Sequence, residues 1–422
     1  MSPAIISLII LVVVIVLFIT RIIPNAVTAC LGCLLFVLTG ICKVSEAFSG
    51  FSNSIVLLVF GMMVVGIAMQ DTGIAKLIGK QVLKVAKNNE RLFILFAGVT
   101  SAILSSFLSN TSVIAIFLPI IASVTQSNPQ MKRLNLTLPV TMGAMFGGAC
   151  TLVGSTPQLT ANGILSEMCN LQCSMFDYTW VGLIICAVYI LYVQFIGYRL
   201  GNKIWGKRKL DTEMIVKEEN TDIQYDKKKI IIMMIIFVAT IVSFIGAWVS
   251  TEITAITAAI LCIITGCVKQ KSVIKNMDWP VLFILAGCLG IAKGLTVGGF
   301  GDMIGELFVS ILHDGIPPIV IFAIFIIATM CVSNFITNST AVVIFLPVAL
   351  SLCNAVGLNP MTFTIGIVYA ANLTFSTPLA NAQTAMTLVA GYKFSDYIRY
   401  TWPLALLVLI TIIVFVPIFY PL

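Results

Sequence analysis

Charged residues are scarce in this sequence: Asp, Glu, Lys and Arg make up only 10% of its 422 residues, whereas an ordinary soluble protein has about 25%. Hydrophobic residues account for 59%. A chain with so little polar surface is predicted to be an integral membrane protein. Its net charge of +7 is expected to orient the chain in the membrane, and no nucleic-acid partner is expected.

Groups suited to catalysis inside a membrane are also lacking. The only histidine, His313, lies next to Asp314 in a loop, where a solvated side chain is expected. None of the 17 Asp and Glu residues lies in the middle of a predicted span, where a proton relay usually needs one. An intramembrane enzyme is not expected, because it would need a nucleophile with a base or a set of metal ligands.

Apolar runs close to the length of a membrane span recur along the chain. They cover residues 4–20, 26–41, 52–70, 178–198, 230–249, 279–292 and 403–420. These runs predict an all-α polytopic membrane protein, since the strands of a membrane β-barrel are short and alternate in polarity. The first run lacks the basic segment and cleavage site of a signal peptide, so it is predicted to be a retained helix.

The basic residues predict the topology. With the N-terminus outside, all Lys and Arg residues except Lys43 and Lys293 fall in loops on the inner side. This predicts a multi-pass protein of the cell inner (plasma) membrane with both termini outside. The polar stretch 199–229 is predicted to be a cytoplasmic linker, and Lys293 is predicted to be an interfacial anchor.

The two sides of this linker resemble each other in sequence. Four glycines recur 226 positions later, "NTSVIAIFLP" (110–119) recurs as "NSTAVVIFLP" (338–347), and "STP" at 155–157 recurs at 376–378. Residues 1–198 and 230–422 are therefore predicted to be two membrane repeats of five spans each. Because five is odd, the second repeat enters the membrane from the opposite side, as in the inverted repeats of secondary transporters.

Each repeat also contains one apolar stretch that is too long for a single span. Residues 92–124 are flanked on both sides by inner basic residues, which predicts a re-entrant helical hairpin with its tip at Ser109-Asn110-Thr111. Residues 317–352 are predicted to form the matching hairpin, with its tip at Thr337-Asn338-Ser339. Backbone groups freed at such tips are tolerated only where they line a cavity or bind something. Free carbonyls and hydroxyls suit a hard cation, and helix N-termini suit an anion.

Two further spans are broken by polar residues, at 147–163 and 371–387. A single Ser or Thr in a membrane helix usually bonds to its own backbone. Four polar clusters at repeat-related positions are instead predicted to form a binding site.

These clusters resemble a known family. Ser109-Asn110-Thr111 is similar to the Ser-Asn-Thr signature of the divalent anion:sodium symporters (DASS family, ion transporter superfamily), and the loops at 154–157 and 377–378 are similar to its second conserved pair. The likeness extends over nearly the whole chain. It implies an elevator-type homodimer that takes up a small divalent anion, most readily a di- or tricarboxylate, together with Na⁺.

The resemblance also implies roles for individual residues. The first sodium site would use Ser105, Ser109, Asn110 and Gly154, and the second would use Ser333, Asn338 and Ser376. The substrate would contact Asn110, Thr111, Ser155, Asn338, Ser339, Thr377 and Pro378.

The sequence departs from the family pattern in both loops, which read Thr156-Pro157-Gln158 and Pro378-Leu379-Ala380 where the family usually has Pro-Pro-Asn. The identity of the anion is therefore open. The alternatives are a proton-coupled or exchange transporter of sulfate or another inorganic anion on the same fold and, more remotely, a channel or an intramembrane enzyme.

Overall fold

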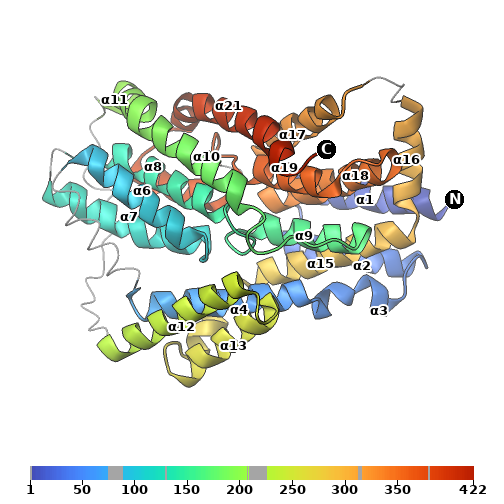
Figure 1. Ribbon diagram of the computed structural model, residues 1–422, viewed down its shortest axis with the longest axis horizontal. Coiled ribbons are helices and arrows are strands. Elements are labelled where there is room, and N and C mark those ends of the chain that lie inside the picture. The colour runs from blue at the N-terminus through green and yellow to red at the C-terminus, as the bar shows by residue number, and fades with distance from the viewer. Residues whose placement is uncertain are drawn as a thin grey trace.

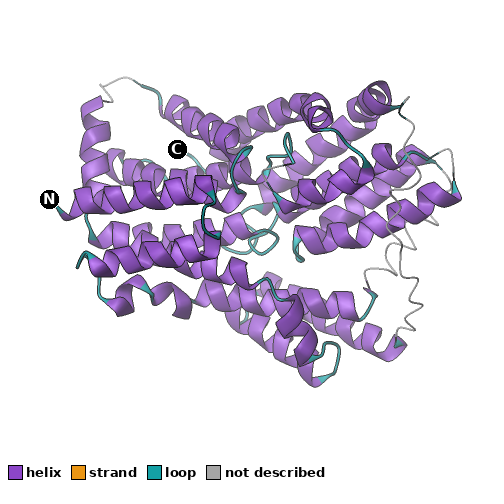
Figure 2. Ribbon diagram, turned by 180° about the vertical axis from the view of Figure 1, so that it is seen from behind, coloured by secondary structure: helices purple, strands orange, loops and turns teal. Residues whose placement is uncertain are grey.

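The computed structural model describes residues 2–74, 89–128, 131–206, 208, 226–311, 316–378 and 381–422. All regular secondary structure in these ranges is helical (Figures 1 and 2). Before the linker the helices are α1 (Pro3–Thr20), α2 (Asn25–Leu38), α3 (Val44–Ala47), η1 (Ser49–Ser52), α4 (Ser54–Asp71), α6 (Glu90–Ser105), α7 (Asn110–Ser127), α8 (Arg133–Gly148), α9 (Thr156–Cys169), α10 (Thr179–Leu191), η2 (Tyr192–Gly197) and α11 (Tyr198–Trp205).

After the linker they are α12 (Lys227–Gly246), α13 (Thr251–Ile264), α14 (Gln270–Asn276), α15 (Trp279–Val297), α16 (Phe300–Ile311), α17 (Pro318–Ser333), α18 (Asn338–Val356), α19 (Pro360–Asn372), α20 (Ala382–Met386), η3 (Thr387–Ala390) and α21 (Phe394–Phe419). Some predicted features lie outside the described residues: the basic residues from Lys76 to Lys87, most of the linker, His313, and Leu379 with Ala380.

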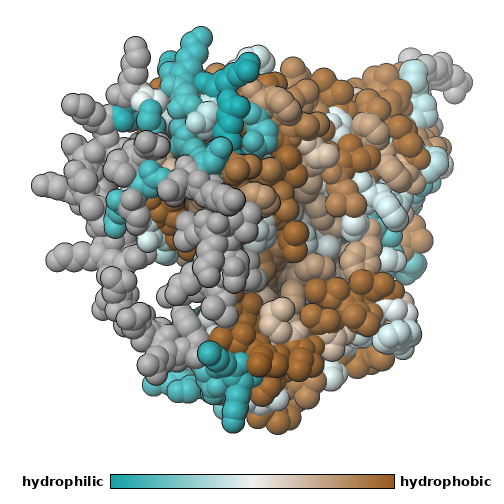
Figure 3. All heavy atoms as spheres, turned by 60° about the vertical axis from the view of Figure 1, so that its left-hand side comes forward, coloured by the Kyte–Doolittle hydropathy of each residue, from teal (hydrophilic) through white to brown (hydrophobic). Residues whose placement is uncertain are grey.

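The predicted spans correspond to long apolar helices. Among the described residues, 7 helices are long and apolar enough to cross a membrane, and α10, η2 and α11 together form one of them. α1, α12 and α21 expose many apolar side chains, whereas α4, α15 and α18 are largely buried. Figure 3 shows hydrophobic surface over much of one face, with hydrophilic residues gathered toward one end. The all-α polytopic membrane fold is confirmed.

Each of the two stretches predicted to be a hairpin folds as two helices that pack against each other, and the two pairs lie toward opposite ends of the molecule. In Figure 1, α6 and α7 lie at the end that carries the start of α12, which we call the linker face, while α17 and α18 lie toward the other end. The tips are residues 106–109 and 334–337. Ser109 Oγ accepts from the Ser112 amide at 3.3 Å and Thr337 Oγ1 from the Thr340 amide at 3.4 Å, so each returning helix begins at a hydroxyl cap.

The broken spans show that the predicted correspondence between the two "STP" motifs is wrong. Their second segments begin at Thr156 and Ala382, which are 226 positions apart, whereas the two "STP" motifs are 221 apart. Two equivalent bonds support the longer offset: Thr151 donates to the Ser106 carbonyl, and Thr377 donates to the Asn334 carbonyl. Ser155 therefore corresponds to Asn381, and the two "STP" motifs are not equivalent.

The two halves interlock through close helix contacts. A Cβ atom at Gly61 of α4 would lie 2.6 Å from the backbone of Ala255 in α13, and one at Gly287 of α15 would lie 2.6 Å from Ala29 of α2. The absence of a side chain lets these helices pack closely. Gly61 and Gly287 are 226 positions apart, and so are Ala29 and Ala255, so the two contacts are equivalent in the two halves. Each of these two helix pairs therefore contains one helix from each half.

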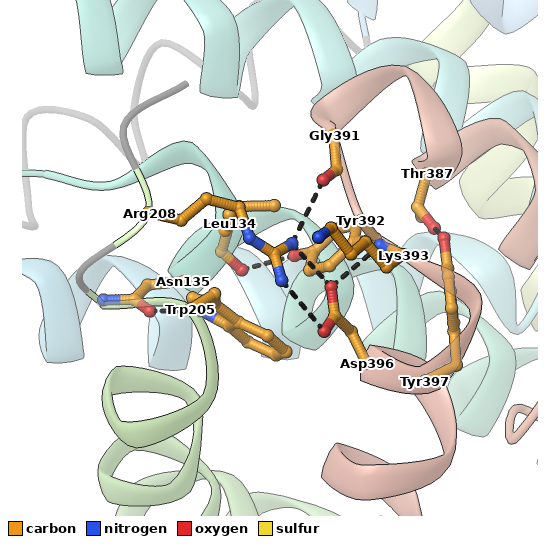
Figure 4. A network of polar contacts seen from close by, with 10 residues as sticks. All are labelled: Leu134, Asn135, Trp205, Arg208, Thr387, Gly391, Tyr392, Lys393, Asp396 and Tyr397. Carbon is orange, nitrogen blue, oxygen red and sulfur yellow. Dashed lines mark hydrogen bonds and ion pairs between the residues drawn. The ribbon is translucent and has the colours of Figure 1, made fainter. Parts of the chain in front are cut away.

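A polar network ties several helices together at the linker face (Figure 4). Arg208 donates to both carboxylate oxygens of the buried Asp396, at 2.7 and 3.2 Å, and to the Gly391 carbonyl at 3.3 Å. Trp205 Nε1 donates to Asn135 Oδ1 at 2.6 Å. The hydrogen bond from Arg208 to Asp396 raises the pKa of the guanidinium. The network fastens the end of α11 to the start of α21 and to α8.

Candidate functional site

A cavity of about 420 Å³ lies between the two hairpin tips. Its polar wall comes from the starts of α7, α9, α18 and α20. Its apolar wall includes Val59, Met62, Met63 and Ile67 of α4, and Val281 and Ile284 of α15. Asn25 at the start of α2, Asn276 at the end of α14 and Asp278 directly before α15 also line it.

Five of the predicted substrate contacts line this cavity: Asn110, Thr111, Ser155, Asn338 and Ser339. Thr377 and Pro378 do not line it, because the Thr377 hydroxyl is turned to the Asn334 carbonyl. Their places are taken by Asn381 and Gln383, which the prediction missed. The offset of 226 between the halves would have identified Asn381 as the partner of Ser155.

The first predicted cation cluster comes together at the tip of the α6–α7 hairpin. One end of the Asn110 side-chain amide lies 2.5 Å from Ser105 Oγ and 3.3 Å from the carbonyl oxygens of Gly154 and Ala144. With the amide nitrogen at this end, Asn110 donates to all three oxygens. Three oxygens therefore gather at one end of the Asn110 amide, and oxygens are the ligands that a hard cation prefers. The role of these residues as cation ligands stays a prediction.

Glycine at position 148 makes room for this cluster. A Cβ atom on Gly148 would lie 2.0 Å from Asn110 Oδ1, and one on Gly154 would lie 2.4 Å from the Gly148 carbonyl. A side chain at position 148 would displace the Asn110 amide, and one at position 154 would displace the backbone of Gly148. The loop between α8 and α9 can therefore approach Asn110 only because both positions are glycine.

The second cluster differs in composition. Asn338 Oδ1 accepts from Thr374 Oγ1 at 3.1 Å and from Ser333 Oγ at 3.4 Å, and Ser333 Oγ donates to the Ala371 carbonyl at 2.8 Å. Ser376, predicted for this cluster, instead accepts from Thr401 of α21 at 3.0 Å. Ser109, predicted for the first cluster, caps α7 and donates to Ser112 Oγ at 2.7 Å.

Two buried amides connect the halves behind the cavity. Asn372 Nδ2 donates to Gln158 Oε1 at 2.8 Å, while Asn372 Oδ1 accepts from Ser155 Oγ at 2.7 Å. Gln158 Nε2 in turn donates to the Gly148 carbonyl at 2.9 Å. This chain of contacts fixes the cavity residue Ser155 and the glycine loop relative to the second half.

The electrostatics of the cavity come mainly from neutral groups. No Lys or Arg is among the described residues that line it, and Asp278 is their one charged side chain. Partial burial raises the pKa of Asp278, an otherwise exposed residue, above that of an ordinary Asp. The first residues of α7, α9 and α18 all line the cavity, and helix N-termini attract negative charge. The polar wall is therefore suited to an anion.

A scan against protein families agrees with this geometry. The profile of the citrate transporter family (CitMHS) matches residues 15–338 and 318–421. The chain belongs to this family. It is a multi-pass membrane transporter and not an enzyme, and a small anionic substrate is implied by its family.

Curated relatives support the resemblance to the divalent anion:sodium symporters. An uncharacterized transporter of Haemophilus influenzae is 25% identical over 96% of this chain and 90% of its own length. The sodium-dependent dicarboxylate transporter SdcS is 24% identical in Staphylococcus aureus strain USA300 and 21% identical in Staphylococcus saprophyticus, each over 89% of this chain and 78% of the relative. The predicted family resemblance is confirmed.

A solved structure shows the same fold. The YdaH transporter of Alcanivorax borkumensis superimposes with a TM-score of 0.62 at 12% identity, over 88% of this chain and 86% of that one.

Proposed function

We propose that this protein is a secondary active transporter that couples Na⁺ to the uptake of a small divalent anion, most readily a di- or tricarboxylate. The observation that carries the proposal is the convergence of oxygens around Asn110 at the edge of a cavity walled by helix N-termini. The cluster suits a hard cation and the wall suits an anion. Relatives named sodium-dependent dicarboxylate transporters support the same pairing.

Named residues carry each part of the function. Ser105, Asn110 and the carbonyls of Gly154 and Ala144 would hold the sodium ion that is carried with the substrate. Thr111, Ser155, Asn338 and Ser339 would bind the carboxylates through neutral donors. Because no Lys or Arg is among the described lining residues, sodium supplies the positive charge that favours a dianion.

We infer an elevator mechanism in a homodimer of the plasma membrane. α15 packs against both α2 and α9, and in this mechanism the hairpins and broken spans slide past such a scaffold. In this arrangement the linker would lie in the cytoplasm and both termini outside.

The topology can be tested by cysteine labelling. In a variant without native cysteines, a cysteine at Lys227 should react only from the cytoplasm and one at Asp302 only from outside. Reaction of both from the same side would contradict the inverted arrangement.

A proton-coupled or exchange transporter of sulfate or another inorganic anion is the second candidate. It is favoured by Asp278, a carboxylate of raised pKa that lines the cavity. Uptake of a panel of labelled anions by the purified protein in liposomes separates the two. Sodium-driven uptake of dicarboxylates or citrate supports the proposal, whereas uptake that follows only a pH gradient supports the second candidate. Counterflow distinguishes either carrier from a channel.

A further inference from the structure

One polar side chain of the cavity has no polar counterpart in the other half. At the offset of 226, Gln383 of α20 corresponds to Pro157 of α9, and both residues line the cavity. The next residue of each helix supports this alignment, because Gln158 and Thr384 each donate to the carbonyl seven positions earlier, at 3.3 and 3.1 Å. The second half therefore presents an amide to the cavity where the first half presents a proline ring.

The Gln383 amide is open to a ligand, whereas its polar neighbours are used within the protein. Asn381 Nδ2 donates to the Thr374 carbonyl at 2.8 Å, and Asn381 Oδ1 accepts from the Thr384 amide at 2.9 Å, which caps α20. In the part of the chain that the structure describes, Gln383 has no hydrogen-bond partner. Gln383 thus offers the cavity both a hydrogen-bond donor and an acceptor.

This amide lies to one side of a pair of related anion-binding groups. Asn110 and Asn338 begin the returning helices of the two hairpins, and both line the cavity. The two carboxylates of a dianion can be held by these two tips, which the repeat makes similar. α20 packs against α7 of the first hairpin, so Gln383 adds a third polar contact on one side alone. Such a site suits an anion that carries one further polar group besides its carboxylates.

The chemistry of the amide indicates which group this is. A keto oxygen could bond only to the amide nitrogen, and an ammonium group only to the amide oxygen, whereas a hydroxyl can bond to either. A hydroxyl is also neutral, so it adds no charge to a cavity whose described lining residues include no Lys or Arg. An anion without this hydroxyl would leave the Gln383 amide to water.

We propose that Gln383 is a specificity-determining residue that selects hydroxylated di- or tricarboxylates over analogues that lack the hydroxyl. The proposal rests on the proposed transport of a small divalent anion and narrows its substrate class. Gln383 contributes a hydrogen bond to the substituent, while the residues of the two tips hold the carboxylates.

The test compares malate with succinate, which differ by one hydroxyl, on the purified, full-length protein at saturating Na⁺. The dissociation constant of succinate should exceed that of the better-bound enantiomer of malate by roughly 2–10-fold, the contribution of one hydrogen bond. Gln383→Met keeps the length of the side chain without its hydrogen bonds and should bring the two constants together. Gln172→Met, the same change at an exposed glutamine outside the cavity, is the matched control and should keep the wild-type ratio.

Citrate and tricarballylate also differ by one hydroxyl and give a second, independent ratio, which should respond to the same variants in the same way. Because each ratio compares two ligands on one protein, a general loss of stability does not change it. Gln383→Ala provides the same test if Gln383→Met does not fold.

The outcomes separate this inference from the proposed function. Equal affinities for each pair on the wild type, or a wild-type ratio in the Gln383 variants, would overturn the inference and leave the transport of carboxylates standing. Binding of none of the four anions would overturn both.

Discussion

Asn372 and Gln158, 214 positions apart in the chain, are joined by a 2.8 Å hydrogen bond between their buried side-chain amides. Asn372 lies at the end of α19 in the second half, and Gln158 lies in the first turn of α9 in the first half. The bond makes the two broken spans one unit, so that residues of both halves face a common cavity. Its removal should therefore affect substrate binding.

Asn372→Ala should weaken anion binding, because Ser155 and Gln158 both lose their partner on α19. Leaving a buried amide unpaired costs about 1–3 kcal/mol, which corresponds to roughly 5–150-fold in an equilibrium constant. Anion binding and thermal unfolding of the variant measure the two effects. Asn354→Ala, an exposed asparagine of α18, is the matched control and should behave as wild type. Unchanged anion affinity in folded Asn372→Ala would show that the amide pair does not shape the cavity.

Asp278 should make anion binding dependent on pH. Partial burial raises its pKa, so as the pH is lowered its carboxylate is neutralised sooner than that of an ordinary Asp. The cavity then loses this negative charge. The affinity of the wild type for an anion should therefore rise several-fold as the pH falls. Asp278→Asn should bind the anion more tightly at neutral pH and lose this component. Parallel pH profiles for the two proteins would show that Asp278 does not act on the anion.

Arg208 should matter for stability rather than for sodium binding. Its guanidinium contacts both oxygens of Asp396, whose side chain is 3% exposed. Arg208→Gln leaves this carboxylate without its cation, at an expected cost of at least about 1–3 kcal/mol in the free energy of unfolding. Thermal unfolding measures the loss, and Asp396→Asn in the same background should recover part of it. A wild-type melting temperature for Arg208→Gln would contradict the structural role of the network in Figure 4.

Lys293, which is predicted to be an interfacial anchor, forms an ion pair with Glu167 at 3.4 Å. The pair joins α15 to α9, so an elevator movement that slides these helices would break it. Because a partly exposed pair contributes about 0–1 kcal/mol, Lys293→Met should shift the balance of inward- and outward-facing states only modestly. The rate of labelling of a cavity cysteine from the cytoplasm measures the shift. Exchange of the two charges should restore the wild-type rate, and no change in Lys293→Met would argue that the pair is not specific to one state.

The elements of the fold were predictable because they depend on composition and charge. The apolar runs gave the spans, and basic residues on both sides of residues 92–124 gave the hairpin that is observed as α6 and α7. Asn110 and Asn338 were predictable because an amide and hydroxyls in an apolar stretch need partners.

The details of the site were less predictable, for two physical reasons. A repeated tripeptide suggested an offset of 221, although helix starts and hydrogen bonds follow 226. The oxygen that Ala144 contributes is a backbone carbonyl, so the identity of the residue at position 144 does not reveal the contact.

The dependence of anion affinity on sodium tests the central claim most directly. If Na⁺ beside Asn110 supplies the charge that holds the anion, each ligand must raise the affinity for the other by the same factor. Titration of the purified protein with a dicarboxylate, from zero to saturating Na⁺, should show the apparent dissociation constant falling, and a coupling of about 1–3 kcal/mol corresponds to roughly 5–150-fold. The fall should be absent in Asn110→Ala. An affinity that does not change with Na⁺ in the wild type, together with uptake that follows a pH gradient, would contradict the account.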